Sequence, residues 1–142
     1  MPDSLNYSDL SVGDSIPEFV TPPINRTQLA LFAGASGDHN PIHLDDEEAK
    51  SGGLPGVIAH GMLSMAFLGR VLTNWVPQHQ IRGWNARFVA MAFPDDVITC
   101  KGVISAKSIE AGEDRVKLDI SVENQKGENI LVGTADIAIK GN

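Results

Sequence analysis

Two side chains that can exchange protons, Asp38 and His43, lie in a short segment that no single regular helix can contain. Pro41 lies between them, lacks a backbone N–H and disfavours helical geometry at the residue before it. Gly37, just before Asp38, permits a turn. We therefore expect a helix to end before Asp38, so that irregular backbone carries both side chains. Irregular segments beside rigid elements often hold catalytic and binding residues.

A long apolar run follows from Val57 to Leu72. Its apolar residues fall on nearly all sides of a helix, which predicts a buried helix. Gly61 lies in the expected first turn, where backbone N–H groups have no partner within the helix. These N–H groups and the helix dipole favour a developing negative charge. The sequence thus combines a proton-exchanging pair with a candidate oxyanion site.

Each residue of the pair also has a structural interpretation. Alone, Asp38 would usually serve as a loop carboxylate or a cap, and His43 as a hydrogen-bonded structural histidine. Their spacing with Gly37, Asn40 and Pro41 favours a functional site instead.

Three further polar residues are interpreted as supports of that site. We expect Asn40 to hold the backbone rather than a water, and His60 to orient the turn before Gly61 rather than to face a ligand. Ser64 lies one helical turn after His60, where its hydroxyl can bond a backbone carbonyl. Arg87 interrupts an apolar pattern, and either a phosphate contact or solvent exposure would account for it. His39 and His79 are expected on the surface.

The elements that position these residues follow from caps, breakers and periodicity. Asn25 is a good N-cap, Asp45 or Asp46 can start a short helix, and Pro77 ends the long one. Helices are therefore expected over residues 26–36, about 45–50 and about 60–75. The apolar period then changes to two, which predicts strands joined by short turns in an antiparallel meander. The expected strands cover residues 16–20, 84–93, 97–109, 116–122 and 130–139. One apolar helix and such a meander predict the α+β class.

One group of positions carries a resemblance to a known family: Ser36-Gly37-Asp38-x-Asn40-Pro41-Ile42-His43, Ala49, and Ala59-His60-Gly61-Met62. They resemble the MaoC-like family of (R)-specific enoyl-thioester hydratases and dehydratases. Within it, the chain is most similar to the catalytic B subunits of mycobacterial hydroxyacyl-ACP dehydratases. The likeness follows the layout of the whole chain and is tight from about Phe32 to Leu72.

The resemblance implies a single hotdog fold over residues 1–142, in which an antiparallel sheet wraps around a long central helix. It also implies reversible hydration of a trans-2-enoyl thioester, on CoA or acyl carrier protein (ACP), to an (R)-3-hydroxyacyl thioester. Asp38 and His43 would act on one water, and the Gly61 N–H would meet the thioester oxygen. Asp38 is the preferred base, although which of the pair protonates C2 stays open. No cofactor is implied.

Two departures from the family pattern stand out. Gly69 occupies a position where some hydratases have a serine, which makes room in the expected substrate tunnel for a longer acyl chain. The turn Pro94-Asp95-Asp96 replaces the usual Pro-Gly-Asp. Three alternatives remain: a hotdog acyl-thioesterase, a non-catalytic acyl-thioester-binding partner subunit, and a structural protein with a chance motif.

Length, charge and composition limit the classes of partner that the protein can bind. The chain has 142 residues, enough for one domain, and a net charge of −7, which disfavours nucleic acid and anionic membranes. The N-terminal residues contain no basic apolar signal segment, and polar residues break the longest apolar run. A cytoplasmic protein is expected. The resemblance implies a homodimer, or a heterodimer with a homologous subunit.

Cysteine and metal chemistry are not expected. Cys100 is the only cysteine, and its alternating apolar neighbours predict a buried strand residue. The histidines are scattered along the chain and give no ligand spacing typical of a metal site.

Overall fold

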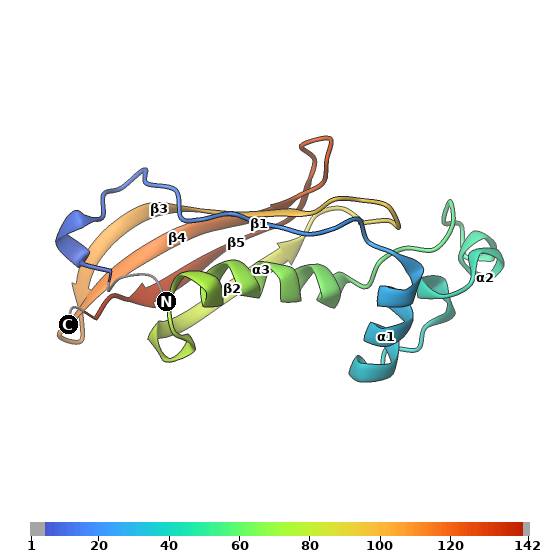
Figure 1. The fold of residues 1–142 in the computed structure, drawn as a ribbon, viewed down its shortest axis with the longest axis horizontal. Coiled ribbons are helices and arrows are strands. Elements are labelled where there is room, and N and C mark those ends of the chain that lie inside the picture. Colours follow the sequence, from blue (N-terminus) through green and yellow to red (C-terminus); the bar gives the residue numbers. More distant parts are fainter. Residues whose placement is uncertain (1–4, 141–142) are drawn as a thin grey trace.

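The computed structural model describes residues 5–140. A curved antiparallel sheet packs on a long helix, and two shorter helices extend beyond the start of that helix (Figure 1). The helical elements are η1 (Tyr7–Asp9), α1 (Arg26–Ser36), η2 (Pro41–His43), α2 (Asp46–Ser51), α3 (Gly61–Trp75) and η3 (Gln78–Gln80), where η marks a 3-10 helix. The strands are β1 (Phe19–Val20), β2 (Ile81–Phe88), β3 (Thr99–Glu110), β4 (Glu113–Glu123) and β5 (Asn129–Ala138).

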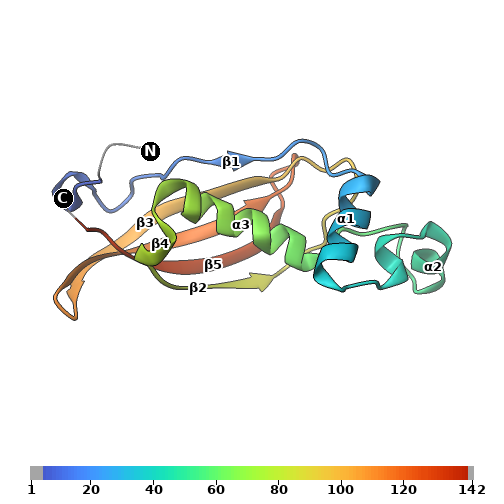
Figure 2. The same ribbon diagram turned by 60° about the horizontal axis from the view of Figure 1, so that its bottom comes forward.

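The sheet has the strand order β1-β3-β4-β5-β2, and every neighbouring pair is antiparallel. β3, β4 and β5 follow one another as a meander, whereas β2 precedes them in the chain and lies at the far edge beside β5. The sheet curls around α3 (Figure 2). The predicted hotdog arrangement of an antiparallel sheet wrapped around a central helix is therefore confirmed.

The core lies between α3 and the concave face of the sheet. On β4, inward and outward residues alternate, so that Val116, Leu118, Ile120 and Val122 are all buried. Fully burying an aliphatic side chain is worth about 1.5–3 kcal/mol, which makes this face a main source of stability. α3 is less enclosed than its composition predicts, since Met62 remains 57% exposed. The sheet of one chain covers only one side of the helix.

Local sequence signals set the helix ends. The Asn25 side chain accepts the Gln28 N–H at 2.8 Å and caps α1 at the expected residue. Gly37 ends α1 with φ +80°, a left-handed conformation that suits glycine. Asp45 caps α2 by accepting backbone N–H groups of Glu47 and Glu48.

Two strands differ from prediction. β1 has two residues rather than five, because Pro17 has no N–H for the ladder and only a bridge from Ser15 to Val103 precedes it. β2 starts at Ile81 and ends at Phe88, not at residue 93. Val89 and Ala90 still donate to the Ile130 carbonyl of β5, at 2.9 and 3.3 Å. The chain then turns toward the start of α3, where the Ala92 carbonyl accepts the Ala59 N–H at 2.8 Å.

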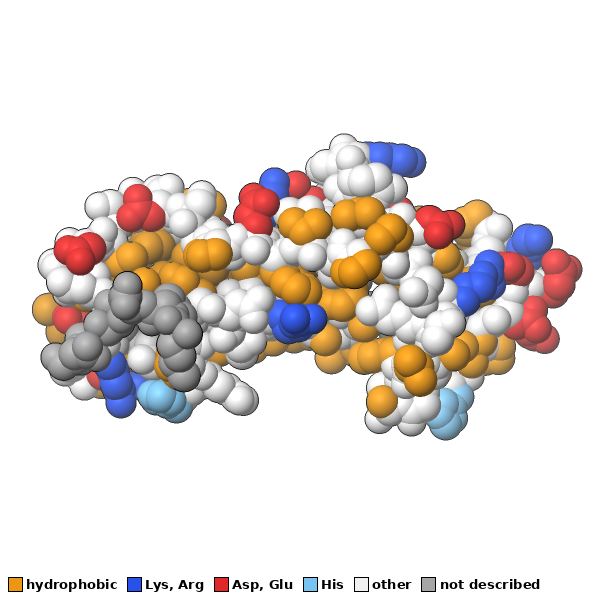
Figure 3. Space-filling model, viewed as in Figure 1, with side chains coloured by type: hydrophobic (Ala, Val, Ile, Leu, Met, Phe, Trp, Pro, Cys, Tyr) orange, Lys and Arg blue, Asp and Glu red, His pale blue; other side chains and the backbone are white. Residues whose placement is uncertain are grey.

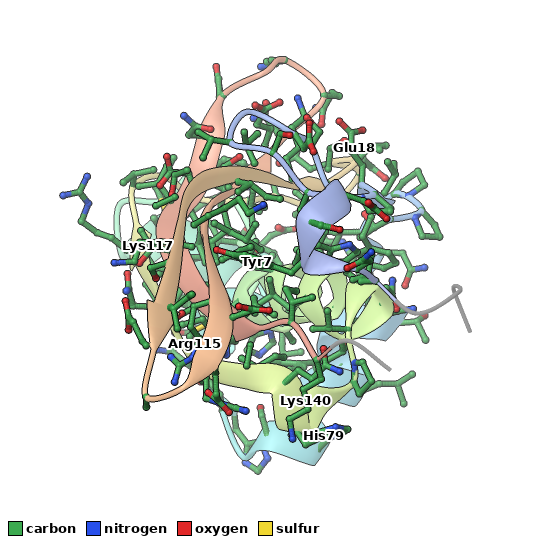
Figure 4. All side chains as sticks on the ribbon, turned by 90° about the vertical axis from the view of Figure 1, so that its left-hand side faces the viewer. Tyr7, Glu18, His79, Arg115, Lys117 and Lys140 are labelled. Carbon is green, nitrogen blue, oxygen red and sulfur yellow. The ribbon has the colours of Figure 1, made fainter. Side chains whose placement is uncertain are left out.

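The N-terminal segment closes the end of the sheet opposite α1 and α2. The Lys107 ammonium donates to the carbonyls of Tyr7 and Leu10 and lies 4.1 Å from the centre of the Tyr7 ring. The Tyr7 hydroxyl donates to the Ser108 carbonyl at 3.3 Å. Figure 4 views the molecule from this end, with Tyr7 and Arg115 labelled. Residues 5–140 contain no helix with the length and hydrophobicity needed to cross a bilayer.

Candidate active site

The candidate site forms where η2 and the segment before it meet the start of α3. Figure 1 shows α1 and α2 beyond this end of α3. The stack of His43 on His60 places the connection between α1 and α2 beside the first turn of the long helix. Asp38 and His43 come from that connection, and His60 is the N-cap residue of α3. The tertiary structure thus brings three side chains from two separate segments together.

His43 is buried, with 7% of its surface exposed. Its Nδ1 lies 2.7 Å from the Ile58 carbonyl oxygen. Because a carbonyl can only accept, we assign the hydrogen of the neutral ring to Nδ1, which leaves the lone pair on Nε2. That Nε2 lies 3.5 Å from Oδ2 of Asp38.

Asp38 is held by its own loop. Its side chain is 49% exposed. Oδ1 accepts the Asn40 N–H at 3.3 Å, and the Asp38 N–H donates to the Ser36 hydroxyl at 3.2 Å. The Asn40 side chain in turn accepts the Ile42 N–H at 3.2 Å and caps η2. Asn40 therefore braces the backbone between the two members of the pair.

His60 is fully buried and contacts both members of the pair. Its Nε2 lies 3.2 Å from the Asp38 backbone oxygen. Its ring stacks on His43 with centroids 3.9 Å apart and planes 25° apart, and Phe32 meets it edge-on at 4.9 Å. Burial lowers the pKa of His60, an effect that the Asp38 carbonyl opposes and the His43 ring reinforces.

Ser64 does not behave as predicted. It is buried, but among residues 5–140 its hydroxyl has no hydrogen-bond partner, and neither does Nδ1 of His60. The expected acceptor one turn earlier is the His60 carbonyl. That oxygen already accepts the N–H groups of Leu63 at 3.1 Å and Ser64 at 3.4 Å, which leaves no free lone pair for the hydroxyl.

Gly61 opens α3, and its N–H makes no hydrogen bond within the described part of the chain. A Cβ at this position would lie 3.0 Å from the ring of Phe88. The free donor therefore lies beside a half-exposed aromatic ring at the end of β2. The arrangement provides a hydrogen-bond donor at an apolar surface, next to the pair.

Asp38, His43 and His60 also place three potential metal ligands within 4.8 Å of one another, a cluster that sequence spacing did not reveal. Imidazole nitrogens bind a metal in the plane of the ring. The planes of His43 and His60 are nearly parallel and about a ring thickness apart, so their lone pairs do not converge on one ion. The geometry suits proton exchange better than coordination.

The remaining predicted positions lie away from this cluster. Gly69 lines a hollow of about 500 Å³ between α3 and β2, where its missing side chain faces Trp84. Along the helix it lies about 12 Å from Gly61, at 1.5 Å per residue. His39 and His79 are exposed as expected. Arg87 is exposed in a separate surface hollow that also contains Lys101.

One functional contact was missed. Ile58 fixes the His43 ring through its backbone carbonyl. Every residue type carries a carbonyl, so no signal in the sequence could have identified this one.

Comparisons with known proteins agree with this fold. A family model described as a MaoC-like domain matches residues 11–126. The solved structure of R-hydratase PhaJ1 from Pseudomonas aeruginosa, unliganded, superposes with a TM-score of 0.82 at 30% identity, covering 96% of this chain and 86% of that one.

Two curated relatives match as well. Fatty acid synthase subunit beta of Schizosaccharomyces pombe is 32% identical over 138 residues, which is 92% of this chain and 6% of that protein. The 3-hydroxyacyl-thioester dehydratase Z of Mycobacterium tuberculosis is 35% identical over 71 residues, which is 50% of this chain and 43% of that protein. The chain thus spans only a small part of the synthase subunit.

The fold and the relatives define a protein with the hotdog fold. The chain belongs to the MaoC-like domain family, as the resemblance implied. The finer likeness to catalytic B subunits stays a prediction.

Proposed function

We propose that the protein catalyses the reversible hydration of a trans-2-enoyl thioester to an (R)-3-hydroxyacyl thioester. The observation that carries the proposal is the 3.5 Å separation of His43 Nε2 and Asp38 Oδ2. With the carboxyl ionised and the imidazole neutral, both atoms are hydrogen-bond acceptors, and two acceptors cannot bond to each other. One water beside them can donate a hydrogen to each.

In the hydration direction that water adds its oxygen to C3 of the substrate and gives a proton to the pair. Asp38 is our preferred base and His43 the partner that holds the water. As the C3–O bond forms, the alkene electron pair shifts toward the thioester and its oxygen becomes an enolate oxygen. A proton from the pair then adds to C2, so water is consumed and the enzyme returns to its starting state. Each acid–base group of this kind commonly contributes about 10²- to 10⁴-fold to the rate.

The Gly61 N–H is our candidate donor to the enolate oxygen. It lies in the first turn of α3, has no partner within residues 5–140 and benefits from the helix dipole. One donor of this kind is worth about 3–4 kcal/mol in acyl-transfer oxyanion holes. Asn40 and His60 complete the site as supports through their bonds to the Ile42 N–H and the Asp38 carbonyl, whereas the Ser64 hydroxyl makes no such bond within residues 5–140.

The substrate is an acyl-CoA or acyl-ACP, and no cofactor takes part. The acyl chain would run toward the hollow beside Gly69, whose wall includes Ala66 and Trp84. A serine at position 69 would fill part of that space. This supports a longer acyl chain than serine-containing relatives accept.

We also propose a dimer formed by single-domain protomers. β2 is an edge strand with no partner on its outer side among residues 5–140, and such edges favour pairing with another strand. Phe88 is 48% exposed at its end, and Met62 of α3 is exposed as well. Figure 3 shows hydrophobic side chains open to solvent in the middle of the face that α3 crosses. A homodimer is the simplest arrangement, and a homologous chain that lacks the pair could replace one copy.

The test is to mix the purified protein with crotonyl-CoA and longer enoyl-CoAs and to follow the loss of enoyl absorbance. Hydration removes the conjugated double bond without releasing a thiol. Release of free CoA would identify a thioesterase instead. Binding without either change would identify a non-catalytic partner subunit.

A further inference from the structure

His60 contacts both members of the acid–base pair, yet the proposed reaction gives it no proton to carry. Its Nε2 lies 3.2 Å from the Asp38 backbone oxygen, and its ring stacks on His43 at 3.9 Å. Its backbone directly precedes Gly61. One buried side chain therefore connects the pair to the first turn of α3.

The contacts define the protonation state of His60. The Asp38 carbonyl can only accept, so the hydrogen of the neutral ring lies on Nε2. Nδ1 then carries a lone pair and has no partner among residues 5–140. A second proton there would be a buried donor without an acceptor, which is costly. The titratable groups that face the ring are Asp38 and His43. Burial, the largest effect, and the His43 ring lower the pKa of His60, and together they outweigh the opposing effect of Asp38.

A neutral His60 also suits the neighbouring His43. His43 gains partial positive charge when its Nε2 accepts a hydrogen bond from the water. A positive ring stacked at 3.9 Å would repel that charge, whereas a neutral ring does not.

Asp38 needs an anchor outside its own loop. Among residues 5–140, its carboxylate accepts only the N–H of Asn40, two residues away, and its own N–H donates to Ser36, again two residues away. These bonds move with the loop. The His60 Nε2–H instead ties the Asp38 backbone to α3, which is packed against the sheet.

We propose that His60, as a neutral Nε2–H imidazole, is a positioning residue of the hydration reaction. Its N–H anchors the Asp38 backbone and its ring holds the plane of His43, so that carboxylate and imidazole face the same water. This inference rests on the proposed function. Misplacing a catalytic group by about 1 Å can cost about 10²-fold in rate.

Two variants separate the two contacts. His60→Phe keeps an aromatic ring against His43 and removes the donor to Asp38. His60→Gln keeps an amide N–H that can reach the same carbonyl and removes the aromatic ring. Phe32→Leu is the matched control, because it removes a ring that meets His60 edge-on and leaves the Asp38 bond in place.

We expect His60→Phe to lower kcat about 10²-fold with KM little changed. The pH profile of kcat should keep the wild-type shape at a lower plateau. His60→Gln should recover part of the loss. Phe32→Leu should lower the Tm and leave kcat close to wild type. A folded His60→Phe variant with wild-type kcat, or a loss that lies only in KM, would overturn the proposal. A pH profile that loses one limb would show that His60 carries a proton itself and would overturn it too.

Nitrogen-15 NMR of the wild-type imidazoles tests the bond without any substrate. His60 should show one protonated and one unprotonated ring nitrogen at neutral pH, and it should gain a second proton at lower pH than an ordinary histidine, which titrates between about pH 5 and about pH 8. Two protonated nitrogens at neutral pH would contradict the inference. If the wild-type protein hydrates no enoyl thioester, the proposed function fails, while the NMR result still decides whether His60 is the neutral anchor.

Discussion

Nε2 of His43 lies 3.5 Å from Oδ2 of Asp38, and neither atom carries a hydrogen when the imidazole is neutral and the carboxyl ionised. The two atoms are close enough to share one water. They cannot bond to each other directly, because both are then hydrogen-bond acceptors. The two residues therefore act as a unit, and variants of either should behave alike.

Asp38→Asn and His43→Gln should each lower kcat by about 10²- to 10⁴-fold, and the double variant should be little worse than either single one. Both groups act on the same water, so after the first loss the second group has no reaction to assist. Steady-state kinetics on the three variants measures this. Circular dichroism melts and ligand binding serve as controls, because a loop-bracing role would lower the Tm and keep kcat. A folded single variant with near wild-type kcat would contradict the assignment.

Gly61→Pro should abolish turnover, because proline removes the N–H proposed for the enolate oxygen. The fold should survive, since proline is tolerated in a first helical turn and His60 has ψ 132°, which suits a residue before proline. Gly61→Ala is the matched control: it keeps the N–H and adds only the Cβ that presses on Phe88 at 3.0 Å. Equal losses in the two variants would assign the effect to the Phe88 clash and remove the Gly61 N–H from the mechanism.

Gly69→Ser should shorten the preferred acyl chain. The added Cβ would lie 3.4 Å from the Trp84 ring and would occupy part of the hollow between α3 and β2. Relative rates on C4 and longer enoyl-CoAs measure the change. Gly69→Ala separates bulk from polarity, because it adds the same Cβ without the hydroxyl. Unchanged relative rates in both variants would show that Gly69 does not line the acyl path.

The protein should have the mass of a dimer in solution, measured by light scattering. Phe88→Glu places a charge at the end of the β2 edge and should shift the mass toward that of a monomer. Ile109→Glu is the control, since Ile109 is 73% exposed on β3, near the β3–β4 turn, and should leave the mass unchanged. A wild-type monomer that turns over substrate would disprove the dimer.

Acid should destabilise the protein partly through Glu113. Arg82, with Nη2 2.6 Å from its Oε1, and Arg115 lower the pKa of Glu113 to about 2. The folded-state pKa is below the unfolded value of about 4.3. The stabilisation is therefore complete above that value and is lost as the pH falls toward 2.

Chemical unfolding of Glu113→Gln should show lower stability than wild type at neutral pH, and the difference should vanish between about pH 4.3 and about pH 2. Glu47→Gln is the control, because the Glu47 side chain is 88% exposed and its pair with Lys50 is long, at 3.4 Å. A Glu113→Gln difference that persists at the acid end would assign the effect to packing rather than to charge.

The sequence by itself determined the local elements and the chemical character of the site. The Asn25 cap, the Gly37 turn and the alternation along residues 116–122 depend on backbone conformation and burial within one segment, and the structure has all three. The motif around Asp38 and His43 also fixed the family, since that spacing is specific.

Only the tertiary structure decided how these segments meet. The position of β2 beside β5, the stack of His60 on His43 and the Ile58 carbonyl on His43 all join residues from different segments. A carbonyl has no signature in the sequence, and a stacking distance depends on how the whole core packs. Ser64 illustrates this limit: its helical position predicted a backbone bond, but the neighbouring N–H groups occupy that acceptor in the folded chain.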